Sequence, residues 1–138
     1  MEQEIQAMKE TLQLIPDLKS QFQIQRNPDG CGPLIYTGVA ESNLIPKLSP
    51  LVEKYFGKAY KAAGAGAFFM NWFDSFVRNV GGVRKDQTLF RKAIADDIDL
   101  FCAFWPWGTN PIKTSIRVGI ICPEEREPEL EKALKGLF

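Results

Sequence analysis

The sequence predicts an α+β fold: a mostly antiparallel sheet of about four strands, formed by two hairpins, with helices packed against it. Two observations predict this class. The predicted strands come in adjacent pairs and do not alternate with helices. In most of the remaining segments, apolar residues recur at the three- and four-residue spacing of helices. With 138 residues, the chain is expected to form a single globular domain over residues 1–138.

The composition narrows the classes of function. The chain has 17 Lys plus Arg, 17 Asp plus Glu and no histidine. The balanced charge argues against a nucleic-acid partner. The lack of histidine excludes Ser-His-Asp and Cys-His nucleophiles and histidine-based zinc sites within one chain. No sequence motif indicates a cofactor or a metal, so none is expected, and an enzyme is the least favoured class.

Cysteine usage and hydropathy indicate the compartment. Cys31, Cys102 and Cys122 lack C-x-x-C spacing, and two of the three lie in apolar runs, which is typical of buried thiols in a reducing compartment. The chain starts with an acidic, polar stretch, unlike a signal peptide. No apolar run approaches the roughly 18–20 residues of a membrane span. We therefore expect a soluble cytoplasmic protein with no membrane partner.

The N-terminal third predicts a helix and then a hairpin. Apolar residues recur every three or four positions over residues 2–15, which predicts a helix that Pro16 ends or breaks. Residues 21–26 alternate polar and apolar, as in a half-buried strand. A turn rich in Gly and Pro follows, and residues 34–39 form the return strand, with Cys31 at the tip.

A second helix is predicted between Asn43 and Gly64. Ser49 can cap it and Pro50 suits its first position, although the helix could begin earlier, near Asn43. Either Gly57 or Gly64 could end it. The Ala-Gly run that follows lacks the preceding strand and the further glycine of a dinucleotide-binding loop, so we expect it to permit close backbone packing.

An unusually aromatic helix is predicted over residues 68–80, ending at Gly81-Gly82. Its aromatic and apolar residues recur at helical spacing on one face: Phe69, Trp72 or Phe73, Phe76 and Val80. This face has two interpretations. It packs on the sheet as core, or it forms one wall of a pocket for an apolar or planar ligand.

The segments on either side of the next strand pair are expected to be helical. Residues 86–96 are ambiguous: a helix capped by Asp86 is the preferred prediction, and a strand beginning at Thr88 is the alternative. The segment from Glu127 onward predicts a final helix with Leu130 and Leu134 facing inward.

Residues 98–122 predict the central antiparallel strand pair. The first strand is apolar on both faces, with Leu100 and Phe104 on one and Phe101 on the other, which indicates a strand covered on both sides. In the second strand, Gly119 is expected to mark a bulge or a close approach by another group. The connection, Trp105 to Pro111, is rich in Pro, Gly and Asn.

Three places could support chemistry or binding. Asp96, Asp97 and Asp99 form an acidic cluster that lacks the further ligands of a calcium loop. Cys31 lies between two glycines and is the candidate reactive thiol, although only Arg26 lies near in sequence to lower its pKa. Exposed tryptophans are costly unless they pack on the body or bind, so the Trp105–Trp107 loop is the strongest candidate.

Two hypotheses of function follow. The first is a non-enzymatic module that binds a small apolar or planar ligand in an aromatic pocket. The residues predicted to line this pocket are Phe69, Trp72, Phe73, Phe76, Phe101, Phe104, Trp105 and Trp107. The second is a protein-interaction or accessory subunit that uses the Trp105–Trp107 loop. A homodimer is one form that such a subunit could take. A thiol-dependent enzyme using Cys31 is a distant third.

Overall fold

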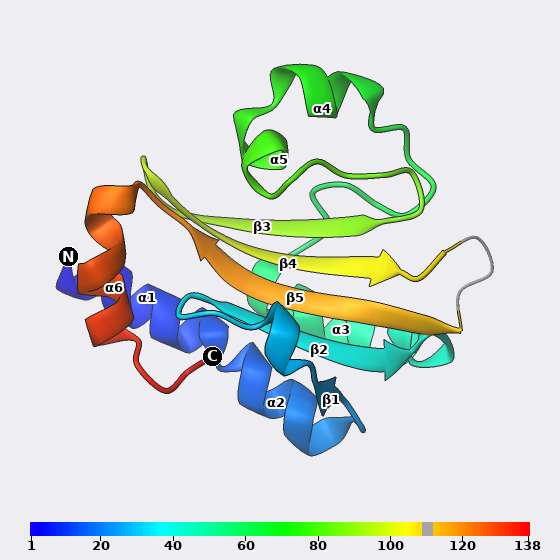
Figure 1. The fold of residues 1–138 in the computed structure, drawn as a ribbon, viewed down its shortest axis with the longest axis horizontal. Helices are drawn as coiled ribbons and strands as arrows, with labels where there is room; N and C mark the ends of the chain where they lie inside the picture. The colour runs from blue at the N-terminus through cyan, green and yellow to red at the C-terminus, as the bar shows by residue number, and fades with distance from the viewer. Residues whose placement is uncertain (109–111) are drawn as a thin grey trace.

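The computed structural model describes residues 1–108 and 112–138, apart from the side chain of Phe69. It has the predicted α+β class, with a five-stranded antiparallel sheet between two layers that contain helices (Figure 1). None of the helices in these residues is both long and apolar enough to cross a membrane. The sheet has one strand more than predicted, because residues 88–95 form a strand.

The elements have the following bounds. The helices are α1 (Glu2–Leu12), α2 (Leu14–Gln21), α3 (Ile45–Phe56), α4 (Phe68–Phe73), α5 (Ser75–Asn79) and α6 (Glu127–Ala133). The strands are β1 (Gln25–Arg26), β2 (Ile35–Glu41), β3 (Thr88–Ala95), β4 (Ile98–Pro106) and β5 (Lys113–Ile121). Their order in the sheet is β1-β2-β5-β4-β3.

The β4–β5 pair lies inside the sheet, as predicted. Its register runs from Asp99 opposite Ile121 to Pro106 opposite Thr114. Alternate side chains of β4 enter two different hydrophobic cores, Phe104 on one face and Phe101 on the other. The prediction that this strand is covered on both sides is therefore confirmed.

Helices α1, α2, α3 and α6 cover one face of the sheet and enclose the larger core (Figure 1). Their apolar stripes supply fully buried side chains such as Met8, Leu18 and Val52. In α6, Leu130 and Leu134 are 0% and 1% exposed, so the predicted inward face of this helix is confirmed.

Two helix boundaries differ from the simplest predictions. The predicted helix over residues 2–15 is interrupted at Gln13, and α2 then continues to Gln21. Pro16 lies in the first turn of α2, where a missing N–H breaks no intrahelical bond, so it does not end the helix. The next helix follows the earlier of its two predicted starts, and Gly57 ends it with a φ of 81°.

The N-terminal hairpin is present but shorter than predicted. Only Gln25 and Arg26 of the predicted strand pair with β2, opposite Val39 and Gly38. Gln21 ends α2, and residues 22–24 lead from it to β1 without pairing with β2.

The preferred prediction of a helix over residues 86–96 is wrong. Residues 88–95 form β3, which pairs with β4 from Thr88 opposite Phe104 onward. Leu89 and Phe90 point into opposite cores, which is the period-two alternation of a strand. The apolar spacing of this segment fits both the helical period of 3.6 residues and the strand period of two. Pairing with the edge of β4 selects the strand.

The aromatic segment forms two short helices where one was predicted over residues 68–80. The break is at Asp74, whose extended backbone (φ −95°, ψ 110°) separates α4 from α5. The Asp74 carboxylate accepts a hydrogen bond from the Val77 N–H at 3.2 Å and caps α5. Phe76 and Val77 are buried in the smaller core, on the other face of the sheet.

Gly119 tests how tightly the central strands are packed. A Cβ at this position would lie 2.8 Å from Phe101 Cε1 and 3.0 Å from the Leu34 carbonyl oxygen, so the predicted close approach is present. We expect Gly119→Ala to lower the free energy of unfolding by about 1–3 kcal/mol, measured by urea denaturation. Gly32→Ala is the matched control, because nothing lies within 4 Å of its Cβ. Equal effects of the two substitutions would contradict this packing argument.

Candidate functional site

The aromatic residues predicted to line one pocket are distributed over separate places. Phe104 lies in the larger core, with its ring centroid 5.4 Å from that of Phe90. Phe101 lies in the smaller core with Phe76, on the opposite face of the sheet. Trp72 and Phe73 are 64% and 77% exposed. The structure therefore does not bring these side chains around one cavity.

A small pocket does lie beside Phe104, at the end of the sheet. Its volume is about 260 Å³. It is lined by Ser42, Ile45, Pro46, Ala63, Asp86, Thr88, Phe104, Pro106 and Thr114. The hydroxyls of Ser42 and Thr114 are 2.8 Å apart. This is an apolar hollow with a few polar groups at its wall, just below the usual volume of a ligand pocket.

Trp105 and Trp107 have different environments. The guanidinium of Arg117 lies 4.7 Å from the Trp105 ring centroid, and the Trp105 Nε1–H is buried without a hydrogen-bond partner among the described residues. Trp107 is 48% exposed, and its Nε1–H donates to Ser115 Oγ at 2.7 Å. Trp107 therefore folds back onto its own hairpin. Residues 109–111 of the predicted loop lie outside the described residues.

The polar candidates are held by local contacts. Cys31 Sγ is partly buried and accepts the Thr37 N–H at 3.3 Å. Asp99 pairs with Arg91 at 2.9 Å, and Asp97 pairs with Arg126 at 3.1 Å. Within the described part of the chain, no cluster of three or more acidic or cysteine ligands could hold a metal ion.

The most unusual surface is formed by α4, which lies beyond β3 at one extremity of the molecule (Figure 1). Phe68, Trp72 and Phe73 are 68%, 64% and 77% exposed; we call these three side chains the aromatic platform. The Phe68 and Trp72 ring centroids are 6.3 Å apart, so these two rings are adjacent. An ordinary surface helix buries such residues.

The polar residue of α4 has the opposite orientation. Asn71 Nδ2 donates to the Val83 carbonyl at 2.8 Å, and Asn71 Oδ1 accepts the Val83 N–H at 2.8 Å. The side-chain amide thus pairs with a backbone segment as a neighbouring strand would. The Asn71 amide fixes the helix to the body, while Phe68, Trp72 and Phe73 are exposed.

A buried lysine supports the same layer. Lys61 is 3% exposed, and its ammonium donates to the carbonyls of Arg84, Lys85 and Gln87 at 2.6–2.7 Å. Burial lowers the pKa of Lys61. Its backbone also exchanges two hydrogen bonds with Leu89, which joins residues 57–67 to the edge of the sheet. Sequence analysis missed this residue, because no local pattern marks a lysine that will be buried.

A second set of polar contacts holds α5. The Tyr60 hydroxyl donates to the Asp74 carboxylate, and this bond raises the pKa of Tyr60. The Arg91 guanidinium lies 4.9 Å from the Phe76 ring centroid and 5.6 Å from that of Tyr60. The bond from Arg91 to Asp99 raises the pKa of the guanidinium, so Arg91 remains charged in this stack.

Charge is unevenly divided along the chain. Residues 57–87, which carry the aromatic platform, contain five Lys or Arg and two Asp or Glu, a net charge of +3. Because the whole chain is neutral, the remaining residues carry −3. The aromatic surface is therefore part of the basic portion of the protein.

Replacing Lys61 tests its structural role. Lys61→Met would remove the ammonium donor from three carbonyl groups, of which those of Arg84 and Lys85 keep a backbone donor. We therefore expect a loss of about 1–3 kcal/mol in the free energy of unfolding. Urea denaturation measures this loss, and hydrogen exchange should show faster exchange over residues 81–87. The control is Lys58→Met, at an exposed lysine nearby, which should leave both measurements unchanged. An unchanged free energy of unfolding in Lys61→Met would mean that the three hydrogen bonds make no net contribution to stability.

Comparison with known proteins adds no relative. The chain matches no family model, no curated protein and no solved structure. The function proposed below therefore depends on the geometry of this chain alone.

Proposed function

We propose that this protein is an interaction module that binds an acidic partner protein through the aromatic platform of α4. One observation carries the proposal: α4 directs Asn71 inward and Phe68, Trp72 and Phe73 outward. Exposed apolar clusters of this kind are typical of protein-interaction surfaces.

The energetics favour a protein partner with an apolar recess. Tryptophan and phenylalanine bury about 150–250 Å² each and are common as binding hot spots. Asn71 and Lys61 fix the backbone around α4 before any partner arrives. Such preorganisation reduces the entropy lost on binding.

The charge of residues 57–87 indicates the character of the partner. The segment of residues 57–87, which carries the aromatic platform, has a net charge of +3, and this charge favours an acidic partner over a basic one. The partner we propose therefore combines an apolar recess with a surrounding excess of carboxylates.

The pocket beside Phe104 supports a second candidate function, the binding of a small apolar molecule. Phe104, Ile45 and Pro46 supply apolar wall, and the Ser42–Thr114 hydroxyl pair can orient a polar group of the ligand. Native mass spectrometry of the purified protein tests this proposal. A bound molecule that is lost on Thr88→Trp, which fills the pocket, would support it, and a mass of the bare chain would count against it.

The interaction module is tested by photo-crosslinking. A benzophenone amino acid in place of Phe73 traps the neighbouring protein in cells, which is then identified, purified and titrated by calorimetry. We expect Trp72→Ser to weaken its binding by about 30-fold, the loss of one hot spot. For the wild-type protein, raising the salt concentration from about 0.05 to about 0.5 M should also weaken binding, because salt screens the attraction between exposed charges.

Ile112→Ser is the matched control, since Ile112 is a 72% exposed apolar side chain outside α4. It should bind the trapped protein like the wild type. Equal affinity of the Trp72→Ser and wild-type proteins would contradict the proposal. The proposal would also be contradicted if the wild type bound anionic lipid vesicles and the crosslinker at position 73 trapped no protein.

A further inference from the structure

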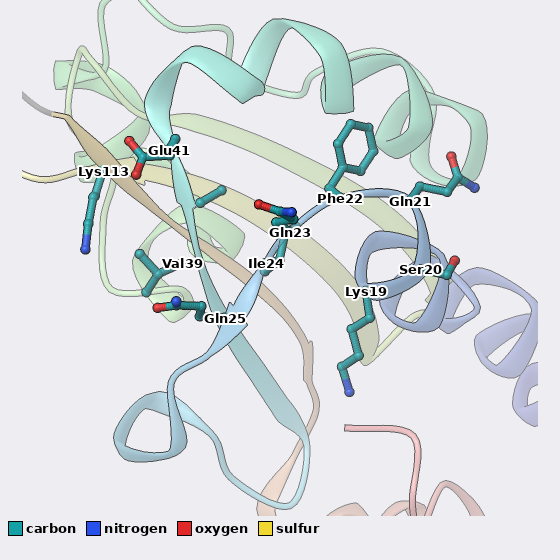
Figure 2. A pocket seen from close by; sticks show the side chains of 11 residues that line it. Lys19, Ser20, Gln21, Phe22, Gln23, Ile24, Gln25, Val39, Glu41 and Lys113 are labelled. Atoms are coloured by element: carbon teal, nitrogen blue, oxygen red, sulfur yellow. The ribbon is translucent and has the colours of Figure 1, made fainter.

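A second surface lies at the opposite edge of the sheet, where β1 should continue along β2. A groove of about 600 Å³ opens between the last turn of α2, residues 22–25 and the end of β2 (Figure 2). It is lined by Lys19, Ser20, Gln21, Phe22, Gln23, Ile24, Gln25, Val39, Ala40, Glu41 and Lys113. None of these residues belongs to the aromatic platform or to the pocket beside Phe104.

The groove exists because the first strand begins only at Gln25, after the point opposite the end of β2. β1 pairs with β2 in a register that places Gln25 opposite Val39, and Asn27 donates to the Thr37 carbonyl at 2.9 Å. Continued by two residues, this register would place Gln23 opposite Glu41. Instead the Ile24 N–H bonds to the Phe22 carbonyl at 3.0 Å, a tight turn that takes the chain away from the edge.

The backbone of Glu41 therefore faces the groove. On the other side of β2, Ser42 donates to the Ile112 carbonyl at 2.7 Å. Because hydrogen-bonded pairs alternate in an antiparallel ladder, the adjacent pair Glu41–Lys113 is not hydrogen-bonded. The Glu41 N–H points toward the β1 side, where no strand of the described chain pairs with it. The Glu41 C=O is the N-cap carbonyl of the 3-10 turn Ser42–Leu44 and accepts the first bond of that turn. An unpaired N–H at a strand edge can bind another chain.

The side chains around this edge suit a peptide. Gln23 and Gln25 extend their amides toward the side of the groove where Val39 lies, and Ile24 and Val39 give the groove apolar wall (Figure 2). A side-chain amide can bond both the N–H and the C=O of one residue in an extended chain, as Asn71 does with Val83 in this same protein.

Charge adds a preference. Lys113 lies with Glu41 at one end of the groove and Lys19 lies at the other (Figure 2). Among the described residues neither lysine forms an ion pair. The Lys19 ammonium lies 5.0 Å from the Tyr36 ring centroid. An acidic side chain at the Lys19 end would therefore meet an unneutralised cation.

We propose that this groove binds an extended acidic peptide segment of a partner protein by strand addition to Glu41. The peptide lies along the edge of β2, and one of its main-chain carbonyls accepts a hydrogen bond from the Glu41 N–H. Its carboxylate pairs with Lys19. Main-chain bonds supply affinity in this mode, and side-chain contacts supply specificity.

One substitution isolates the main-chain bond. Glu41 has a φ of −60°, which proline adopts without strain, and its N–H has no partner within the described chain, so Glu41→Pro should fold normally. It removes the donor and blocks the edge. Glu41→Ala is the matched control, because it removes the same carboxylate and keeps the N–H. Thermal unfolding should give the two variants similar midpoints.

The probe is a phage-displayed library of random octapeptides selected on wild-type protein. We expect enriched peptides that bind wild type and Glu41→Ala alike and bind Glu41→Pro at least about tenfold more weakly, the loss of one hydrogen bond with its edge. Lys19→Met should weaken the binding of the enriched peptides that carry an acidic residue. On wild-type protein, a thioamide in place of the peptide carbonyl that faces Glu41, which is a weaker acceptor, should also weaken binding, so the test survives a misfolded proline variant.

Three outcomes would overturn the proposal. No peptide is enriched, or the enriched peptides bind Glu41→Pro as tightly as wild type. The free protein forms a concentration-dependent dimer that Glu41→Pro abolishes, so that a second copy occupies the edge. The Glu41 amide is protected from hydrogen exchange in the free monomer, so that residues 21–24 already pair there. Because these variants leave α4 intact, the result is separable from that for the aromatic platform.

Discussion

The pairing of β4 with β5 is the interaction on which the rest of the structure depends. β4 is buried on both faces, so a single strand supplies apolar side chains to both layers of the protein. Phe104 packs beneath the helices of the larger core, and Phe101 packs beneath α5. Gly119 in β5 lets Phe101 lie against the backbone of its neighbour. Loss of this pair would separate the two layers.

The two layers are stabilised in different ways. The larger core is apolar and is closed by helices with buried stripes. The smaller layer has fewer buried side chains, and it depends on polar anchors: the Lys61 ammonium, the Asn71 amide and the Asp74 carboxylate. Because these anchors hold α4 and α5, the outward aromatic side chains are not needed to bury the helix. Such departures from the usual pattern are expected at functional positions.

Both proposed surfaces are places where the structure departs from the arrangement that the local pattern predicts. The aromatic side chains of α4 lie outside the cores, and the alternating residues 21–24 lie away from the strand they would pair with. The two surfaces lie on opposite sides of the sheet order, near β3 and at β1. A protein with two such surfaces could hold a folded partner on one and an extended segment on the other.

The sequence by itself determined the α+β class, the central strand pair, its two apolar faces and the inward side of the last helix. These follow from periodicity and composition, which act over a few residues. Only the tertiary structure decided that residues 88–95 are a strand, since their spacing fits both periods and the edge of β4 selects one. The tertiary structure also decided that Phe68, Trp72 and Phe73 of α4 are exposed. The amide of Asn71 bonds to Val83 and turns that side of the helix inward, and the helical pattern alone does not reveal this contact. The burial of Lys61 likewise depends on three carbonyls more than twenty residues away.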